Sequence, residues 1–309
     1  MNDKLVTLIG GGGFLGRYIA QALLKAGARV RVAQRDPRQA FFLRPLGGLG
    51  QTQFVAADVT RPDTISRAVH GADGVVNLVG TFAGNLQRVH VEGARAVAQA
   101  AAQNGATLVH ISAIGADADG DSNYARTKGA GEAAVREACP GATILRPSTV
   151  FGREDQFVNR FAAMIARLPI VPVLRPDARF QPVYVADVAA AAVAALADPD
   201  AGGGDTFELG GPEVLTMLDL NQRIARHIGR SPRFVPLPDA AGSALASLPG
   251  TPVSADQWKL LGHDSVVAAG ARGLDALGVR PTPLDAVAPG WLVRYRKAGR
   301  FGLIDRATG

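Results

Sequence analysis

Residues 5–26 read LVTLIGGGGFLGRYIAQALLKA, which predicts a strand, a glycine loop and a helix in direct succession. The apolar run 5–9 suits a buried strand, and from Phe14 onward the apolar residues recur at helical spacing. Within 10–16 the glycines fit both G-x-G-x-x-G and G-x-x-G-x-x-G. Such glycines let the backbone turn tightly and approach a pyrophosphate, which the free N–H groups of a helix N-terminus bind. The stretch predicts a dinucleotide site, with a glycine-rich turn at an ordinary strand–helix junction as the alternative.

The composition is that of a globular protein with a large core: 309 residues, 47% hydrophobic and 19% charged. A net charge of +6 and a pI near 9.9 favour acidic ligands such as phosphates, or an anionic surface. Zinc-finger spacings and long basic runs are missing from the sequence, so we expect no nucleic-acid partner. Cys139 is the only cysteine and the histidines lack metal-ligand spacing, so we expect no disulfide and no metal site.

Two features of the sequence bear on the compartment. The first expected strand begins almost at Met1, which leaves no room for a signal or transit peptide. Runs of about 18 uninterrupted apolar residues, which a transmembrane helix requires, are missing from the sequence. We therefore expect a cytoplasmic protein without a transmembrane segment.

Strand-like and helix-like segments alternate through the first half of the chain, which predicts βαβ units around a parallel sheet. Residues 36–50, with two prolines and three glycines, interrupt the alternation and suggest an inserted loop. The pattern predicts an α/β fold with a doubly wound parallel Rossmann sheet. The expected strands are 4–10, 28–34, 52–57, 74–80, 106–112 and 142–147, and the expected helices are 14–26, 61–70, 86–104 and 122–138.

After Phe151 the pattern changes, because prolines cluster between 169 and 182 and short elements follow. We expect Asp187 to cap an alanine-rich helix that ends near Leu196, and residues 206–209 to form one more strand. The chain is thus divided into a Rossmann domain over 1–154, completed by elements near 183–210, and a smaller C-terminal lobe over 155–309. Ligands of such sheets bind at the carboxyl edge, beside the predicted lobe.

The end of the second strand bears on the choice of dinucleotide. An NAD site usually places Asp or Glu about 20 residues after the glycines, whereas here Gln34 is followed by Arg35. A guanidinium pairs with a 2′-phosphate, and a carboxylate would repel it. Asp36 could instead reach a ribose, and Arg35 could simply be solvated. We predict NADP(H) as the preferred cofactor, with NAD(H) left open.

Tyr124 and Lys128 form a second pattern, in the segment Tyr124-Ala125-Arg126-Thr127-Lys128. On a helix the i, i+4 spacing places both side chains on one face. A lysine ammonium there lowers the pKa of the phenol and can also donate to a nicotinamide ribose. The pair is suited to general acid–base catalysis next to a bound dinucleotide.

With these motifs the chain resembles the short-chain dehydrogenase/reductase superfamily, in its extended or atypical branches. The resemblance implies a catalytic role for Tyr124 and Lys128, with Ser112 orienting a substrate carbonyl. It also implies that Asp58 and Val59 lie near the adenine and that the segment after Pro147 meets the nicotinamide. The dinucleotide contacts predicted from the glycine loop, the strand ends and this resemblance are Gly10, Gly13, Phe14, Leu15, Gly16, Arg35, Asp58, Val59, Leu78, Gly80, Lys128, Pro147 and Ser148.

Two further segments, 43–51 (LRPLGGLGQ) and 151–157 (FGREDQF), are similar to the dehydrogenase-like accessory subunits of respiratory complex I and their bacterial relatives. That resemblance covers residues 5–165 well and the remainder loosely. It implies a nucleotide that is held firmly for structure or assembly rather than for turnover. It also implies complex I subunits as partners.

The chain departs from the catalytic pattern of active dehydrogenases at two positions. The hydroxyl beside the tyrosine is Ser112, but the alignment could equally place Ala113 in that slot. The helix asparagine of the usual tetrad falls near His90 and is replaced. Ser112 could also be an ordinary hydrogen-bonded hydroxyl at a strand end.

The segment 289–301 mixes aromatic and basic residues, and the charge over 290–309 is +4, from five basic residues and Asp305. Such a segment could rest on an anionic membrane surface or a partner, which would make the protein peripheral at the inner membrane. Alternatively, its aromatic residues pack on their own lobe.

Two functions from different classes are consistent with these patterns. The first is a nucleotide-binding protein of the complex I accessory type. The second is an active NADP(H)-dependent oxidoreductase, or an epimerase or dehydratase, that uses Tyr124 and Lys128 on a small carbonyl or quinone-type substrate.

Overall fold

The computed structural model describes residues 1–247, 253–297 and 299, which form two compact units. The first unit comprises Met1–Pro147, Val185–Leu209 and Ala268–Arg280. The second unit comprises Ser148–Tyr184, Gly210–Val267 and the chain from Pro281 onward. The chain leaves the first unit before the boundary predicted at 154, and residues 268–280 return to it from the segment that we placed in the C-terminal lobe.

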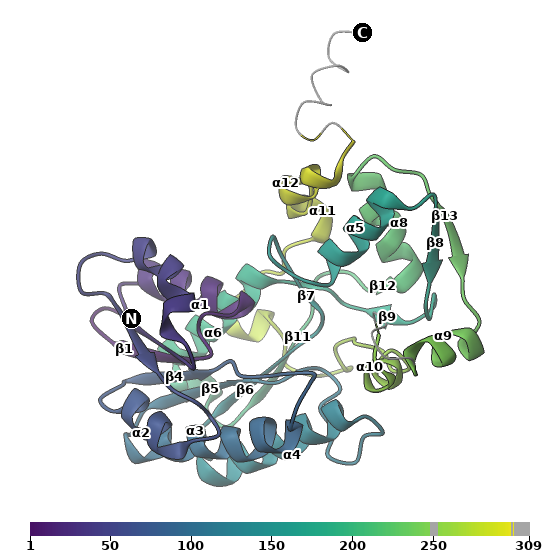
Figure 1. Ribbon diagram of the computed structural model, residues 1–309. Coiled ribbons are helices and arrows are strands. Elements are labelled where there is room, and N and C mark those ends of the chain that lie inside the picture. Colours follow the sequence, from purple (N-terminus) through teal and green to yellow (C-terminus); the bar gives the residue numbers. More distant parts are fainter. Residues whose placement is uncertain (248–252, 298, 300–309) are drawn as a thin grey trace. The chain divides into compact units, whose positions relative to one another are not determined.

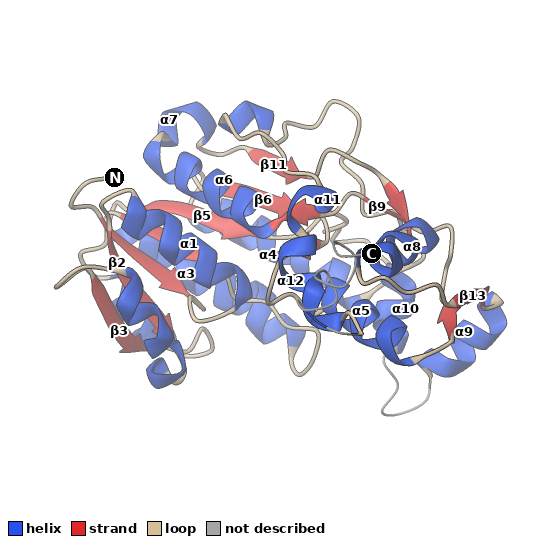
Figure 2. Ribbon diagram, turned by 90° about the horizontal axis from the view of Figure 1, so that it is seen from above, coloured by secondary structure: helices blue, strands red, loops and turns tan. Residues whose placement is uncertain are grey.

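A seven-stranded sheet of parallel strands forms the centre of the first unit, in the order β11-β6-β5-β4-β1-β2-β3. The chain runs outward from β1 in one direction through β2 and β3, and in the other through β4, β5, β6 and β11 (Figure 2). The switch point of this doubly wound sheet therefore lies between β1 and β4. The strands are β1 Leu5–Ile9, β2 Arg29–Gln34, β3 Thr52–Ala56, β4 Gly74–Asn77, β5 Thr107–Ile111, β6 Thr143–Pro147 and β11 Thr206–Leu209.

Helices cover both faces of this sheet (Figure 1). One face carries α1 Phe14–Lys25 and α6 Val185–Ala197, and the other carries α2 Pro62–Val69, α3 Gly93–Gln103 and α4 Asn123–Ala138. Because both faces are covered, the central strands are apolar almost throughout, as the sequence predicted. The predicted Rossmann sheet, with its six strands in the first half of the chain and the strand at 206–209, is confirmed. Two short helical segments complete the unit, α7 Pro199–Gly202 and η3 Asp275–Leu277.

The structure corrects three local predictions. The loop expected at 36–50 contains a 3₁₀ helix, η1 Pro37–Leu46, because the Asp36 side chain caps it and Leu43 is buried beneath it. The helix expected over 86–104 begins with a π-helical turn, η2 Arg88–Glu92, before α3. Asp187 does not precede α6 but lies within its first turn.

Close packing explains two glycines of the first loop. Gly10 has φ +82°, in the left-handed region that favours glycine. A Cβ atom at Gly16 would lie 2.4 Å from the Gly11 carbonyl oxygen, so only glycine lets α1 approach the loop that closely. These two residues fix the path of the backbone at the end of β1.

The second unit is a mixed assembly of short strand pairs and helices around its own core. β7 Val150–Phe151 pairs with β10 Val183–Tyr184, β8 Ile170–Val173 with β13 Arg233–Pro236, and β9 Arg179–Phe180 with β12 Leu215–Thr216. Its core gathers Phe151, Ile165, Leu220, Ile224 and Leu292. The helices are α5 Val158–Arg167, α8 Met217–His227, α9 Asp239–Ala246, α10 Ala255–Leu260, α11 Leu284–Val287, α12 Pro289–Leu292 and η4 Val293–Tyr295.

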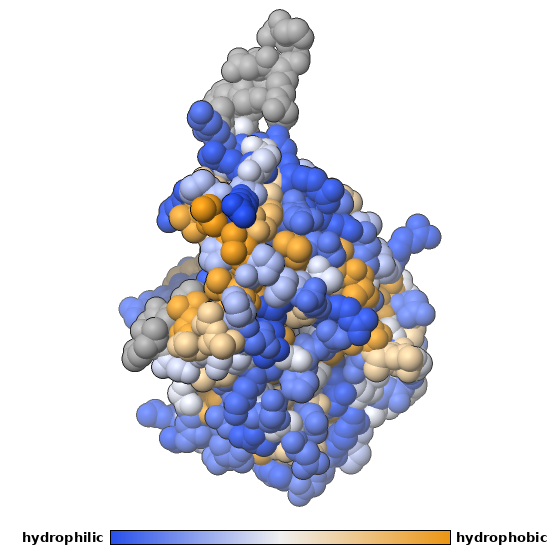
Figure 3. Space-filling model, turned by 90° about the vertical axis from the view of Figure 1, so that its right-hand side faces the viewer, coloured by the Kyte–Doolittle hydropathy of each residue, from blue (hydrophilic) through white to orange (hydrophobic). Residues whose placement is uncertain are grey.

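Helix length and surface hydropathy bear on contact with membranes. Among the residues that the structure describes, each helix is too short or too polar to cross a bilayer. The face in Figure 3 carries hydrophobic residues in patches among hydrophilic ones.

Candidate nucleotide-binding and active site

The glycine loop joins the end of β1 to the N-terminus of α1 at the carboxyl edge of the sheet. Gly13 is the N-cap residue of α1, and neither a capping side chain nor an acidic residue of the first turn occupies the helix end. The positive end of the helix dipole and its first N–H groups are therefore left for an anion. The predicted contact residues Phe14 and Leu15 form the first turn and are half-buried.

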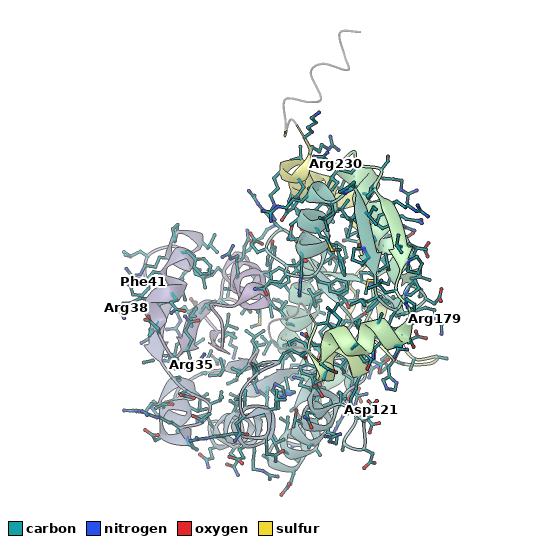
Figure 4. All side chains as sticks on the ribbon, turned by 45° about the vertical axis from the view of Figure 1, so that its right-hand side comes forward. Arg35, Arg38, Phe41, Asp121, Arg179 and Arg230 are labelled. Atoms are coloured by element: carbon teal, nitrogen blue, oxygen red, sulfur yellow. The ribbon has the colours of Figure 1, made fainter. Side chains whose placement is uncertain are left out.

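The side chain of Gln34, at the end of β2, folds over this loop. Its Oε1 accepts a hydrogen bond from the Gly12 N–H at 2.9 Å, and its Nε2 donates to the Asp36 carbonyl at 2.7 Å. Gln34 thus occupies the strand end where an NAD site usually carries a carboxylate. Arg35 follows it and is exposed, and Figure 4 shows Arg35 and Arg38 on the same edge of the first unit.

The predicted adenine residues follow β3. The Asp58 carboxylate accepts hydrogen bonds from the Thr60 N–H and hydroxyl, both at 2.9 Å. These bonds, assisted by the positive charges of Arg35 and Arg61, hold the pKa of Asp58 below its usual range. Val59 is buried against Gly93 of α3. The carboxylate of Asp58 is therefore ionised and near Arg35.

Leu78 and Gly80 follow β4, and Pro147 ends β6, so both sets lie at the carboxyl edge of the sheet. Leu78 is half-buried, Gly80 is exposed, and the Pro147 carbonyl accepts a hydrogen bond from the Ile114 N–H at 3.1 Å. Ser148 begins the second unit, where its hydroxyl donates to the Ser265 carbonyl at 2.6 Å. The structure thus brings the predicted contacts of the first unit to one edge but places Ser148 in a different unit.

Tyr124 lies in the first turn of α4 between two other rings. The ring of Phe82 stacks on it, with centroids 4.4 Å apart and an interplanar angle of 15°, and His90 meets it edge-on at 5.5 Å. Burial raises the pKa of Tyr124 to about 12. We predicted a lowered pKa for this phenol; the removal of the phenolate from water raises it instead.

Lys128 lies one turn further along α4 and is buried. Its Nζ donates to the Ile111 carbonyl at the end of β5, at 2.8 Å. Burial lowers the pKa of Lys128 to about 8, against the opposite effect of Glu132. The predicted pairing of Tyr124 and Lys128 on one helix face is therefore present, with the ammonium anchored to the sheet.

The hydroxyl of Ser112 belongs to a buried polar network. It donates to Glu132 of α4, which also forms a two-point ion pair with Arg146 of β6, at 2.9 and 2.7 Å. Arg146 in turn lies 3.5 Å from Glu208 of β11. Since the Ser112 proton is shared with a carboxylate, the hydroxyl cannot donate it to a substrate carbonyl at the same time. Ala113, the alternative for this slot, carries no polar side chain.

His90, which replaces the usual asparagine, links the loop after β4 to α4. Its Nε2 accepts from the Thr81 N–H at 3.0 Å, so Nδ1 carries the proton and donates to the Thr127 hydroxyl at 2.9 Å. The Thr127 hydroxyl donates onward to the Asn123 carbonyl at 2.8 Å. These bonds hold neutral His90 and, with it, the segment that carries Phe82.

Comparison with known proteins identifies the architecture and the family of the chain. A solved structure from Burkholderia cenocepacia J2315 superposes with a TM-score of 0.69 over 96% of this chain and 99% of that chain, at 19% identity, which shows the fold alone. The family model of the NAD dependent epimerase/dehydratase family matches residues 6–210. The chain belongs to that family.

Relatives from several organisms match nearly the whole chain. NADH dehydrogenase (ubiquinone) 1 alpha subcomplex subunit 9, a mitochondrial protein of Arabidopsis thaliana, is 34% identical over 96% of this chain and 80% of its own length. Ceramide reductase of Caulobacter vibrioides is 32% identical over 98% of this chain and 92% of its own length. The predicted resemblance to an atypical short-chain dehydrogenase of the complex I type is confirmed.

The residues of the first unit fit the nicotinamide dinucleotide that the family binds. A Cβ atom at Gly11 would come 2.7 Å from Leu8 Cβ, so the tight backbone turn of the loop requires glycine at this position. The uncapped N-terminus of α1 follows this turn. In this family the loop residues would hold the pyrophosphate, and Asp58 and Val59 would lie beside the adenine. Clusters of three metal-binding side chains are missing from the part of the chain that the structure describes.

Glu132, Arg146 and Phe82 are the site residues that sequence reasoning left out of the predicted site. Glu132 follows Lys128 by four residues, so the spacing 124, 128, 132 along one helix face was a usable signal. Arg146 gave no such signal, because a charged residue in a strand has no partner until the sheet is assembled. Phe82 gave none either, since its stacking depends on the loop that His90 holds.

The basic C-terminal segment is partly engaged within the second unit. Trp291 and Leu292 belong to its core, Arg294 donates to the Arg153 carbonyl and to Asn159, and Arg296 donates to the His227 carbonyl. The aromatic packing that we considered as the alternative is thus present for Trp291. Residues 298 and 300–309, which carry the rest of the predicted basic segment, lie outside the described residues.

We expect the stability of the protein to fall as the pH drops from 6.5 toward 4, partly because of His90. Burial and the charge of Lys128 lower the pKa of His90 to about 4, whereas the unfolded chain binds this proton near pH 6.5. The unfolded state therefore binds more protons in this window, and native stability falls by about 2–3 kcal/mol.

Urea unfolding of the wild type and of His90→Asn, measured between pH 7 and pH 4.5, tests this prediction. The variant should be less stable at pH 7 and should lose less stability on acidification, while the exposed His70→Asn should follow the wild type. Equal pH slopes for His90→Asn and the wild type would contradict the assignment.

Proposed function

We propose that this chain holds a nicotinamide dinucleotide as a structural element and acts as an accessory or assembly subunit of a complex I type NADH:ubiquinone oxidoreductase. The observation that carries the proposal is the hydrogen bond from Ser112 to Glu132. It leaves Tyr124 without the hydroxyl that would polarise a substrate carbonyl, while the nucleotide-binding loop remains intact. The name of the Arabidopsis relative supports the same role.

In this proposal the nucleotide stabilises the first unit. The loop 10–16 binds the pyrophosphate, and Lys128 donates to the nicotinamide ribose from its buried position. A ligand that binds only the native state raises stability in proportion to the logarithm of its concentration over its Kd. When bound, the nicotinamide ring can accept or supply a hydride, but the structural role does not use this chemistry.

The role in assembly can be tested in the organism of origin. We expect the tagged chain to co-purify with membrane-bound NADH:ubiquinone oxidoreductase, and deletion of its gene to lower the amount of the assembled complex. Tyr124→Phe should restore assembly, because the phenol hydroxyl is not needed, whereas Gly13→Asp should not, because the nucleotide is needed. If Tyr124→Phe did not restore the amount of assembled complex that the wild type restores, a purely structural role would be contradicted.

We further propose that the nucleotide is NADP(H). Arg35 is exposed beside the strand end, within electrostatic reach of Asp58, and Gln34 replaces the carboxylate that would repel a 2′-phosphate. We expect Arg35→Asp to weaken NADPH binding about 10- to 100-fold, the value of a charge-assisted hydrogen bond, and NADH binding much less.

Isothermal titration calorimetry with both nucleotides measures this difference. Arg67→Asp makes the same charge change on the exposed surface of α2 and should alter neither affinity. Equal losses for NADPH and NADH in Arg35→Asp would show that Arg35 does not read the 2′-phosphate.

A reductase is the second candidate, favoured by the juxtaposition of Tyr124 with the buried Lys128 and by the name of the Caulobacter relative. Here Tyr124 would protonate the carbonyl oxygen of the substrate, and Lys128 would stabilise the resulting phenolate. Oxidation of NADPH in the presence of carbonyl or quinone compounds, abolished by Tyr124→Phe, would establish this activity. Turnover by the wild type would overturn the structural role as a complete account.

A further inference from the structure

Two helix–strand turns of the second unit lie side by side. The first, at 167–170, joins α5 to β8, and the second, at 226–233, joins α8 to β13. β8 and β13 pair in parallel with Ile170 opposite Arg233, and the Arg233 N–H donates to the Pro169 carbonyl at 2.9 Å. Because α5 and α8 also pack on one core, both turns lie at the same end of the unit (Figure 1).

The first turn exposes apolar side chains to solvent. Leu168 is 43% exposed and Ile170 is 56% exposed, and Pro169 between them is exposed as well. Of the large hydrophobic side chains that are exposed in the described part of the second unit, only Val214 lies elsewhere. Three consecutive exposed apolar residues form a contiguous surface, which indicates contact with an apolar phase rather than scattered exposure.

Arginines flank these apolar residues. The segments 156–176 and 220–238, which contain the two turns, hold seven arginines and neither aspartate nor glutamate. Arg175 and Arg223 have acidic partners from other segments. Within the described part of the chain, acidic partners are missing for the four arginines of the two turns, which are Arg167, Arg226, Arg230 and Arg233 (Figure 4). The positive charge of the two turns is therefore not compensated within the protein.

One acidic side chain reaches the end of α8 from α11. Asp285 lies 2.7 Å from His227 Nε2 and 3.3 Å from the Arg223 guanidinium. Arg223 is not one of the four unpaired arginines, and the Asp285 carboxylate is already engaged by these two partners. This contact therefore leaves the excess positive charge of the two turns in place.

Exposed aliphatic side chains flanked by unpaired arginines are suited to the surface of an anionic bilayer. There the aliphatic groups enter the boundary between headgroups and acyl chains, and the guanidinium groups meet the lipid phosphates. A purely ionic contact with an acidic protein would leave the exposed apolar turn unused. We propose that the second unit docks on an anionic membrane surface through the turns 167–170 and 226–233. This docking uses residues outside the segment 289–301 and requires neither a bound nucleotide nor catalysis.

Sedimentation with vesicles tests the charged part of this surface. We expect the full chain to bind vesicles that contain phosphatidylglycerol and not vesicles of phosphatidylcholine alone. An arginine near an anionic surface contributes about fivefold to the partition coefficient, so the double variant Arg167→Gln, Arg233→Gln should bind about 25-fold more weakly. The control Lys25→Gln, Arg67→Gln removes the same charge from exposed positions in the last turns of α1 and α2, and should change binding by about twofold at most. Equal losses for the two double variants would show that net charge alone drives binding, which would overturn the proposal.

A second pair of variants tests the apolar part. Leu168→Gln with Ile170→Gln keeps every charge and should weaken binding to the phosphatidylglycerol vesicles about tenfold, because aliphatic surface no longer leaves water. Leu46→Gln with Leu49→Gln changes two exposed leucines of the first unit and should leave binding unchanged. Urea unfolding of each variant verifies that it is folded. Unchanged binding by the Leu168 and Ile170 variant would overturn insertion into the bilayer. Arg233-dependent binding to polyglutamate without binding to vesicles would identify an acidic protein partner instead and would also overturn the proposal.

Discussion

Gly13→Asp should weaken dinucleotide binding about a hundredfold or more, equivalent to about 2.7 kcal/mol, without unfolding the protein. Gly13 has an extended backbone conformation, with φ −75° and ψ −179°, and a Cβ atom there would meet only the Gly10 carbonyl oxygen, at 3.4 Å. Aspartate is also a preferred N-cap residue and interacts favourably with the helix dipole. The new carboxylate would nevertheless stand where the pyrophosphate binds and repel it.

Binding and stability should therefore move in opposite directions in this variant. Calorimetry with NADPH measures the first, and urea unfolding of the ligand-free protein measures the second, which should rise by a few tenths of a kcal/mol. Gly13→Ser caps the helix without a charge and should retain most of the affinity. If Gly13→Asp bound NADPH as well as Gly13→Ser does, the loop would not be the pyrophosphate site.

The second large effect is expected from Glu132→Gln, which should lower the free energy of unfolding by about 3 kcal/mol. Glu132 is almost fully buried and receives hydrogen bonds from Ser112 and Arg146. Loss of its charge leaves the partly buried Arg146 guanidinium with Glu208 alone, at the longer distance of 3.5 Å. The hydrogen bond to Glu132 is also the chief reason that the pKa of Arg146 is raised.

Glu137→Gln is the matched control, because Glu137 lies on the same helix and forms an ion pair with Arg95 at 2.8 Å, but its side chain is 69% exposed. Exposed ion pairs contribute at most about 1 kcal/mol, so the free energy of unfolding of this variant should remain close to that of the wild type.

The Glu132 variant also separates the two candidate functions. An amide in place of the carboxylate weakens the hydrogen bond from the Ser112 hydroxyl, so activity that appears only in Glu132→Gln would mean that the network suppresses catalysis.

Most of the first unit could be predicted because its elements carry strong local signals. One βαβ unit begins with the apolar run 5–9, the glycines that follow it and the helical pattern from Phe14. The same alternation of strand-like and helix-like segments is repeated along the first half of the chain. The 3₁₀ helix at 37–46 was missed because prolines and glycines outweigh the buried Leu43 in a local reading. The return of residues 268–280 to the first unit has no local signal, since it depends on long-range pairing.

The amino-acid sequence by itself determined the glycine loop, the parallel sheet and the presence of Tyr124 and Lys128 on one helix face. Those features depend on backbone freedom and on side-chain periodicity, which act between residues that are close in the chain. Only the tertiary structure decided that Ser112 donates to Glu132 and that burial raises rather than lowers the pKa of Tyr124. Both depend on solvent exclusion and on partners from separate strands, which exist only after the sheet has formed.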